Sequence, residues 1–184
     1  MDTMLLHLIR HTRPLIAPGI CYGQSDVAVT SSDCSSLAAR LKPCWPAHIP
    51  VYSSPLQRCT RLADLLHPTP LIDPRIMELN FGHWEMQAWE QISRSEIDAW
   101  AADVVHYRPG QQENLVQMAG RVSAFLGDLH ATAEPEAVIV CHAGVIKMIA
   151  AWENALGSVG IAQRAVQSKD EFSYGCCIDI NIVM

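Results

Sequence analysis

The sequence predicts an α/β protein with a mainly parallel central sheet, and two observations carry this prediction. Short apolar runs typical of buried strands alternate with segments whose apolar residues recur at helical spacing. Two of these runs also end directly on a histidine, in LIRH and VCHAG. Alternating strands and helices favour a parallel sheet, and side chains at the carboxyl ends of its strands face the crevice where ligands bind.

The first strand is predicted where Leu5, Leu6, Leu8 and Ile9 form an apolar run. Residues 14–30 follow it, and they are rich in Pro and Gly without any periodicity. We therefore expect a loop that folds over the end of this strand.

Two helices with a strand between them are expected next. Residues 31–43 predict a helix with a Ser or Asp cap in its first turn and a proline at its end. IPVYSS, at 49–54, predicts the second strand. Residues 55–66 predict a helix that is capped by Ser53 or Ser54, opened by a proline, and apolar at helical spacing.

The middle of the chain predicts a long connection, partly helical, before the next central strand. Residues 71–85 are expected to be extended and to lead to a turn at Gly82. Residues 84–103 are polar on one side and rich in tryptophan, which predicts a long helix. A loop over 107–114 should cap a helix over 114–130.

The last third contains the most convincing central strand, AVIVCHAG at 137–144. A helix from Gly144 through Leu156 and a final strand within 172–184 complete the prediction. We expect residues 1–184 to form one domain, because this length is enough for one full core and short for two.

Composition narrows the class of partner. The formal net charge of -6 argues against a non-specific nucleic-acid surface, so a phosphate-bearing ligand would need a local cluster of cations. No segment approaches the apolar length of a bilayer span, and MDTMLLHLIR lacks a cationic leader, so we expect a soluble cytoplasmic protein without a membrane partner. Seven cysteines without a CxxC pair favour reduced thiols over disulfides or zinc. Whether the chain forms a homodimer is left open.

Four cationic or imidazole side chains are expected to meet at the strand ends. His11 and His142 each close an apolar strand, and Arg10 and Arg58 can reach the same crevice. Two guanidinium forks beside imidazoles describe a pocket for a dianionic phosphoryl group. The set contains no carboxylate cluster for magnesium, so we expect neither a metal nor a cofactor.

This pocket predicts phosphoryl transfer. His11 can attack phosphorus and form a phosphohistidine if its other nitrogen is held by a hydrogen bond, which we expect from a backbone carbonyl. Arg10, Arg58 and His142 would stabilise the transferring group. Glu78 is the expected donor of the proton that the leaving alkoxide needs.

Four segments, LIRHTRP, VYSSPLQRCTRLADLL, MELNFGHWE and VIVCHAGVIK, resemble the sequence blocks of the histidine phosphatase superfamily, in order and over most of the chain. The resemblance implies the three-layer α/β/α fold of the phosphoglycerate-mutase-like proteins. It also implies that His11 is phosphorylated, that Glu78 donates a proton, and that Arg10, Arg58 and His142 hold phosphate. GICYGQSD and the HTRP variant of the first block are most similar to the α-ribazole-5'-phosphate phosphatases of cobalamin nucleotide-loop assembly.

The chain departs from the family pattern at three positions. Thr12 replaces the usual glycine, Pro14 replaces a common threonine, and Met86 stands where a glycine often follows Trp-Glu. Thr12 should narrow the pocket floor, and Pro14 removes a hydroxyl that could bind phosphate. Gln24 is a further candidate phosphate contact, and Tyr22 or Trp84 could line an aromatic substrate pocket. Glu85 and Glu113 are alternative acids, although a solvated carboxylate is the simpler interpretation of each.

Three hypotheses follow. The first is a metal-independent phosphomonoesterase for α-ribazole 5'-phosphate. The second keeps the chemistry but assigns another small monoester, such as a sugar or glycolytic phosphate. The third is a non-catalytic phosphate-binding protein on the same fold.

Overall fold

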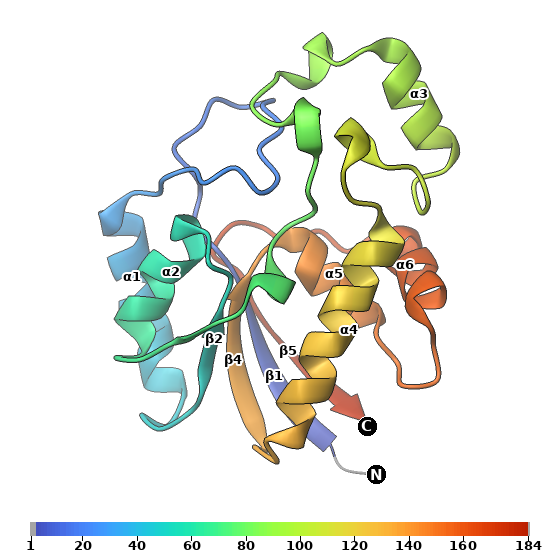
Figure 1. Cartoon of the computed structure of the whole chain (residues 1–184). Helices are drawn as coiled ribbons and strands as arrows, with labels where there is room; N and C mark the ends of the chain where they lie inside the picture. Colours follow the sequence, from blue (N-terminus) through green and yellow to red (C-terminus); the bar gives the residue numbers. More distant parts are fainter. Residues whose placement is uncertain (1–2, 184) are drawn as a thin grey trace.

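The computed structural model describes residues 3–183, which form a five-stranded sheet between two layers of helices (Figure 1). The strand order is β3-β2-β4-β1-β5, and only β5 runs antiparallel to its neighbour. The strands are β1 (Thr3–Arg10), β2 (Val51–Ser53), β3 (Leu71–Ile72), β4 (Glu136–Cys141) and β5 (Cys177–Val183). The helices are α1 (Ser31–Leu41), α2 (Gln57–Leu66), α3 (Arg94–Ala102), α4 (Leu115–Ala131), α5 (Ala143–Ala151) and α6 (Ser158–Gln167). The predicted three-layer α/β/α fold is confirmed.

Both faces of the central strand β4 are buried, as its continuous apolar sequence predicted. Val138 and Val140 pack with α1 and α2 on one side of the sheet. Ala137, Ile139 and Cys141 pack on the other side, with α4, α5 and α6. The two helix layers are thus held on one strand whose side chains alternate between them.

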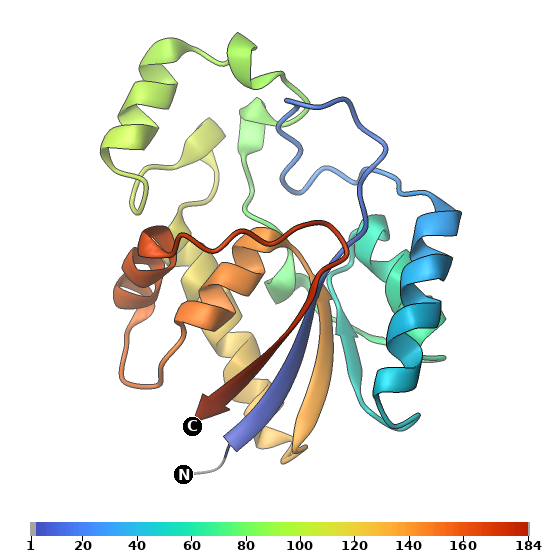
Figure 2. The ribbon, with the colours of Figure 1, turned by 180° about the vertical axis from the view of Figure 1, so that it is seen from behind.

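The pairing of β1 with β4 aligns the two predicted histidines. Arg10 lies opposite Cys141 in the parallel register, so His11 and His142 each follow their strand at the same level. The His11 amide also donates to the Cys141 carbonyl at 3.1 Å. Three connections gather above this edge of the sheet: the loop after β1, the region between β3 and α4, and the segment from α6 to β5 (Figure 2).

Helix α4 begins with a capping box, because the Asn114 side chain accepts from the Gln117 amide and the Gln117 side chain accepts from the Asn114 amide. The predicted cap at the end of the 107–114 loop is therefore confirmed. With 17 residues α4 is the longest described helix, and no helix within 3–183 combines the length and apolarity needed to cross a membrane.

The predicted long helix over 84–103 is wrong. Only α3 is α-helical there, preceded by short 3-10 turns at Gly82–Trp84 and Trp89–Gln91. Met86 has a φ of 64°, which a continuous helix cannot accommodate, and Ala88 pairs with Ile20 of the first loop. The tryptophans cluster with one another above the sheet instead of lining one helix face.

The helix predicted from Gly144 through Leu156 ends earlier, and a further helix was not predicted. Helix α5 stops at Ala151 because Trp152 is extended, with a ψ of 138°. Gly157 then precedes α6, which packs against both α4 and α5. Helix α6 buries an apolar stripe of three residues, Ile161, Ala162 and Ala165.

The caps predicted for the first two helices are also wrong. Helix α1 has Thr30 at its N-cap, and α2 begins only at Gln57, after Leu56. Neither N-cap residue makes a capping hydrogen bond through its side chain. The Ser53 hydroxyl instead donates to the Ser54 carbonyl at 2.9 Å, and the partner of the Ser54 hydroxyl is described below.

Candidate active site

His11 lies at the carboxyl end of β1 with only 1% of its surface exposed. Its Nδ1 is 2.7 Å from the carbonyl oxygen of Thr12. A carbonyl oxygen can only accept, so Nδ1 carries the proton and Nε2 presents a lone pair. Burial, together with the positive charge of Arg58, lowers the pKa of His11 to about 3, so the ring is neutral at physiological pH.

His142 follows β4, and its ring centroid lies 5.2 Å from that of His11. Nδ1 accepts from Nε of Arg58 at 3.4 Å, and a guanidinium can only donate, so the proton is on Nε2. Nε2 in turn donates to Oγ of Ser54 at 2.8 Å. Burial lowers the pKa of His142, and the nearby His11 and Arg58 lower it further. The predicted pair of imidazoles is therefore brought together in neutral form.

Ser54 is a site residue that the sequence analysis did not identify. It follows β2 and is fully buried, and its place in the sequence also fits a helix cap. Its hydroxyl is a poor cap, 3.5 Å from the Leu56 amide, and a good partner for His142. The pattern of two serines between a buried strand and a helix was the available signal, but it suits both roles.

The two predicted arginines supply the positive charge of the site. Arg58 is fully buried in α2, and its guanidinium donates to the carbonyls of Gly23 and of Ser25, the latter at 2.7 Å. Arg10 ends β1 and donates to the carbonyl of Phe172. Within residues 3–183 neither arginine forms an ion pair with a carboxylate. Two uncompensated cations beside two neutral imidazoles make a site that favours an anion.

Glu78 lies beside the same helix terminus. One carboxyl oxygen accepts from the Gly144 amide in the first turn of α5 at 3.1 Å, and the other accepts from the Leu79 amide at 3.0 Å. A Cβ on Gly144 would lie 2.2 Å from the nearer oxygen of Glu78, so only glycine allows this approach. The predicted acid is thus bound to Gly144, two residues along the chain from His142.

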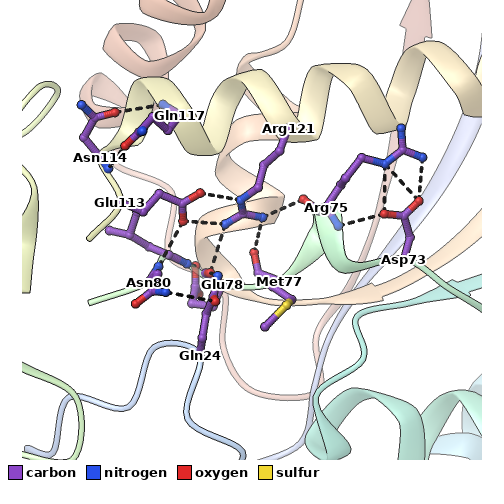
Figure 3. A network of polar contacts seen from close by, with 11 residues as sticks. Gln24, Asp73, Arg75, Met77, Glu78, Asn80, Glu113, Asn114, Gln117 and Arg121 are labelled. Atoms are coloured by element: carbon purple, nitrogen blue, oxygen red, sulfur yellow. Dashed lines mark hydrogen bonds and ion pairs between the residues drawn. The ribbon is translucent and has the colours of Figure 1, made fainter. Parts of the chain in front are cut away.

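A partly buried network anchors the segment that carries Glu78 (Figure 3). The guanidinium of Arg121, on α4, forms two hydrogen bonds with the carboxylate of Glu113, at 2.6 and 2.9 Å. It also donates to the carbonyls of Arg75, Met77 and Glu78, at 2.6, 2.6 and 3.0 Å. Arg121 therefore fixes the backbone of the acid and of the residues that precede it.

The side chain of Gln24, the predicted phosphate contact, forms hydrogen bonds with Glu78 and Asn80 instead (Figure 3). Its amide nitrogen donates to the Glu78 carbonyl at 2.9 Å, and its amide oxygen accepts from Asn80 at 3.3 Å. Both polar atoms of the Gln24 amide therefore hold the Glu78 segment. The alternative acids are also committed: Glu113 pairs with Arg121, and Glu85 accepts from Ser25 at 2.6 Å.

Thr12 and Pro14, two of the residues that depart from the family pattern, contact the neighbouring helix α1 and the first loop. The Thr12 hydroxyl contacts Cys34 of α1 at 3.4 Å, while the Thr12 carbonyl holds His11. Pro14 pairs through its backbone with Val29 across the first loop. Within residues 3–183 no group of three or more His, Cys, Asp or Glu side chains is arranged to hold a metal ion.

An aromatic hollow of about 320 Å³ opens next to Glu78. Its walls include Tyr22, as predicted, together with Phe81, Trp89 and Trp100. Trp89 and Trp100 stack with their centroids 5.9 Å apart and their planes 9° from parallel. Trp84 is not part of the walls, because it is buried behind them with its indole nitrogen 3.2 Å from Glu96.

We expect the stability of the protein to fall in acid partly because of His11. Its pKa is 6.5 when unfolded and about 3 when folded, so only the unfolded chain gains this proton as the pH falls below 6.5. Between pH 7 and pH 5 this lowers the free energy of unfolding by about 2 kcal/mol. Urea unfolding of His11→Gln should show a correspondingly smaller difference between the two pH values.

The control for this measurement is His48→Gln, which removes an exposed ring. If the free energy of unfolding of His11→Gln fell between pH 7 and pH 5 by as much as that of the parent protein, this would contradict the neutral, buried state of His11.

Comparison with known proteins agrees with the geometry of this site. The model of the histidine phosphatase superfamily (branch 1) matches residues 6–165. A protein of Hydrogenobacter thermophilus named as a candidate phosphoserine phosphatase 2 is 26% identical over 114 residues. That match spans 58% of this chain and 56% of the relative, little more than half of either.

Two solved structures share the fold over nearly the whole chain. A mycobacterial glucosyl-3-phosphoglycerate phosphatase has a TM-score of 0.81 at 20% identity, and the match covers 98% of this chain and 91% of that one. A candidate α-ribazole-5'-phosphate phosphatase of Escherichia coli has a TM-score of 0.79 at 23% identity, with 97% and 90% covered. The resemblance in the four sequence blocks is thus confirmed: the chain belongs to the histidine phosphatase superfamily.

Proposed function

We propose that the protein is a phosphomonoesterase that works without a metal, through a phosphohistidine on His11. The observation that carries this proposal is the state of the His11 ring: neutral, with Nδ1–H fixed on the Thr12 carbonyl and Nε2 free to attack. Arg10 and Arg58 supply the positive charge that a transferring phosphoryl group needs.

In the first step Nε2 of His11 attacks phosphorus, and the bond to the ester oxygen breaks as the P–N bond forms. Glu78 gives its proton to the departing oxygen, so the leaving group departs as a neutral alcohol. The hydrogen bond from Nδ1 to Thr12 stabilises the positive charge that develops on the ring.

In the second step water attacks phosphorus and the P–N bond breaks, which returns the lone pair to Nε2. Glu78, now a carboxylate, takes the proton of the attacking water. Inorganic phosphate leaves, and the protonation states of His11 and Glu78 are those of the start. Membership of a phosphatase superfamily and the name of the bacterial relative support this reaction class.

We further propose α-ribazole 5'-phosphate as the substrate, in cobalamin nucleotide-loop assembly in the cytoplasm. This compound joins a phosphate to a flat aromatic base through a ribose. The hollow beside Glu78 is lined by aromatic rings and lies on the side where the leaving group must depart, which supports a substrate of this shape. A sugar phosphate would bring hydroxyl groups against these apolar walls with few partners.

The reaction is tested with His11→Ala in the presence of EDTA. We expect the parent protein to hydrolyse p-nitrophenyl phosphate and α-ribazole 5'-phosphate with EDTA present, and His11→Ala to lose at least about a thousandfold in kcat, because the nucleophile is gone. Measured release of inorganic phosphate reports both. Activity that EDTA abolishes, or that survives in His11→Ala, would overturn the mechanism, and a folded protein without any turnover would favour the phosphate-binding alternative.

The role of Glu78 is tested by the leaving group. Glu78→Gln should lower kcat/KM for α-ribazole 5'-phosphate by about a hundredfold or more, and much less for p-nitrophenyl phosphate, whose leaving group needs no proton. Arg121→Met should show the same selectivity in weaker form, because the Glu78 backbone loses its anchor.

Arg75→Met is the matched control for Arg121→Met. The Arg75 side chain pairs with Asp73 (Figure 3) and with Asp128, and it makes no bond to the Glu78 segment. An equal loss on both substrates in Glu78→Gln would argue against its role as acid.

The aromatic hollow is tested with Trp100→Ala. We expect kcat/KM for α-ribazole 5'-phosphate to fall roughly tenfold to a hundredfold, because a stacking surface is lost, while kcat/KM for glucose 6-phosphate changes little. Trp45→Ala is the control, since Trp45 packs near His7 with its centroid 5.2 Å away, outside the hollow. A parallel fall for both substrates would contradict the assignment of the hollow to the base.

A further inference from the structure

The site at His11 is sealed in this structure. His11 is 1% exposed, and Arg58 and His142 are fully buried. Two hollows flank the site, the aromatic one and a larger one of about 880 Å³, yet none of these three side chains lines either of them. A phosphoryl group cannot reach His11 until some neighbouring side chain moves.

Tyr174 lies beside His11 in the wall of the larger hollow. Its ring centroid is 5.6 Å from that of His11, and its ring also lines the hollow. Its hydroxyl is 2.9 Å from the hydroxyl of Tyr22, which lines the aromatic hollow. The two tyrosines therefore join the loop after β1 to the segment before β5 across the mouth of the site.

Tyr174 also holds one of the two phosphate-binding arginines. The guanidinium carbon of Arg10 lies 3.8 Å from the centre of the Tyr174 ring, a close cation–π contact. Arg10 donates to the carbonyl of Phe172 in the same segment, and within residues 3–183 its buried Nε has no hydrogen-bond partner. The cation is thus engaged with this segment while part of its hydrogen-bonding capacity stays unused.

The backbone of this segment is fixed, so the ring is the element that can move. The Gly175 amide donates to the carbonyls of Arg10 and His11, both at 3.1 Å, and the Arg10 amide donates to Cys176 at 3.1 Å. The larger hollow gives the Tyr174 ring room to rotate away from His11. Arg13, 5.3 Å from the ring centre and exposed, can keep a cation–π contact with the ring there.

We propose that Tyr174 is a gate and a positioning residue: its ring closes the His11 site at rest, and its displacement by a phosphoryl group releases Arg10 to that group. The proposal rests on the proposed function, since it takes His11 as the position of the phosphoryl group. A closed gate lowers the apparent affinity for phosphate by the fraction of molecules that are open. Opening breaks the hydrogen bond between the Tyr174 and Tyr22 hydroxyls and the cation–π contact between the Tyr174 ring and Arg10.

The experiment measures the Kd of inorganic phosphate by calorimetry and by competitive inhibition. Tyr174→Phe and Tyr22→Phe remove the same hydrogen bond from opposite ends, so each should lower Kd by about fivefold. Tyr174→Ala also removes the ring and should lower Kd by about tenfold or more. Tyr52→Phe is the matched control, because Tyr52 packs against Phe125, and it should leave Kd unchanged.

An Arg10→Gln background distinguishes a gating role of Tyr174 from a merely structural role of its ring. In an Arg10→Gln background Tyr174→Ala should gain less than in the parent, because no cation remains to be released. Access to His11 is a second readout: diethyl pyrocarbonate should modify the His11 peptide faster in Tyr174→Ala than in the parent, as measured by mass spectrometry.

A folded Tyr174→Ala with unchanged or weaker phosphate binding and an unchanged rate of His11 modification would overturn the gate. Arg58→Gln distinguishes that failure from failure of the proposed site. Phosphate binding that survives Arg58→Gln at parental strength would show that the anion binds elsewhere, whatever Tyr174 does.

Discussion

The parallel pairing of β1 with β4 is the constraint on which the site depends. Its register sets Arg10 level with Cys141, so the residues that follow, His11 and His142, meet although 131 positions separate them along the chain. A slip of one residue would reverse the faces of β4 and take its valines out of contact with α1 and α2. Core packing on both sides therefore fixes the distance between the two imidazoles.

Burial keeps the two imidazole rings neutral, which is the state in which His11 can act as a nucleophile. An exposed histidine between two arginines would still be neutral only part of the time near pH 6.5, whereas desolvation and the Arg58 charge keep His11 neutral well below that pH. The same low exposure strengthens the field of Arg58, whose hydrogen-bond acceptors within residues 3–183 are carbonyl oxygens and His142. The protein stabilises this unpaired charge with main-chain dipoles, and an incoming anion completes the balance.

The sequence predicted the parts of the site that lie on regular elements and failed where tertiary contacts decide. Strand ends identified His11 and His142, and a helix start identified Arg58, because periodicity locates such positions. Residues 84–103 were misassigned because their apolar side chains pack on the first loop and on one another, which imitates a helical stripe. Ser54, Arg121 and Tyr174 were missed as site residues because each acts through a partner far along the chain.

The close approach of Gly144 to Glu78 has a consequence for how such an enzyme can diversify. The acid and His142 are bound to the same four-residue stretch, Cys141–Gly144, so neither can shift without the other. The aromatic walls, by contrast, come mainly from residues 81–100, which follow Glu78 in the chain and contribute no buried cation to the centre. Exchange of that region can therefore create new specificities while the reactive core is inherited intact.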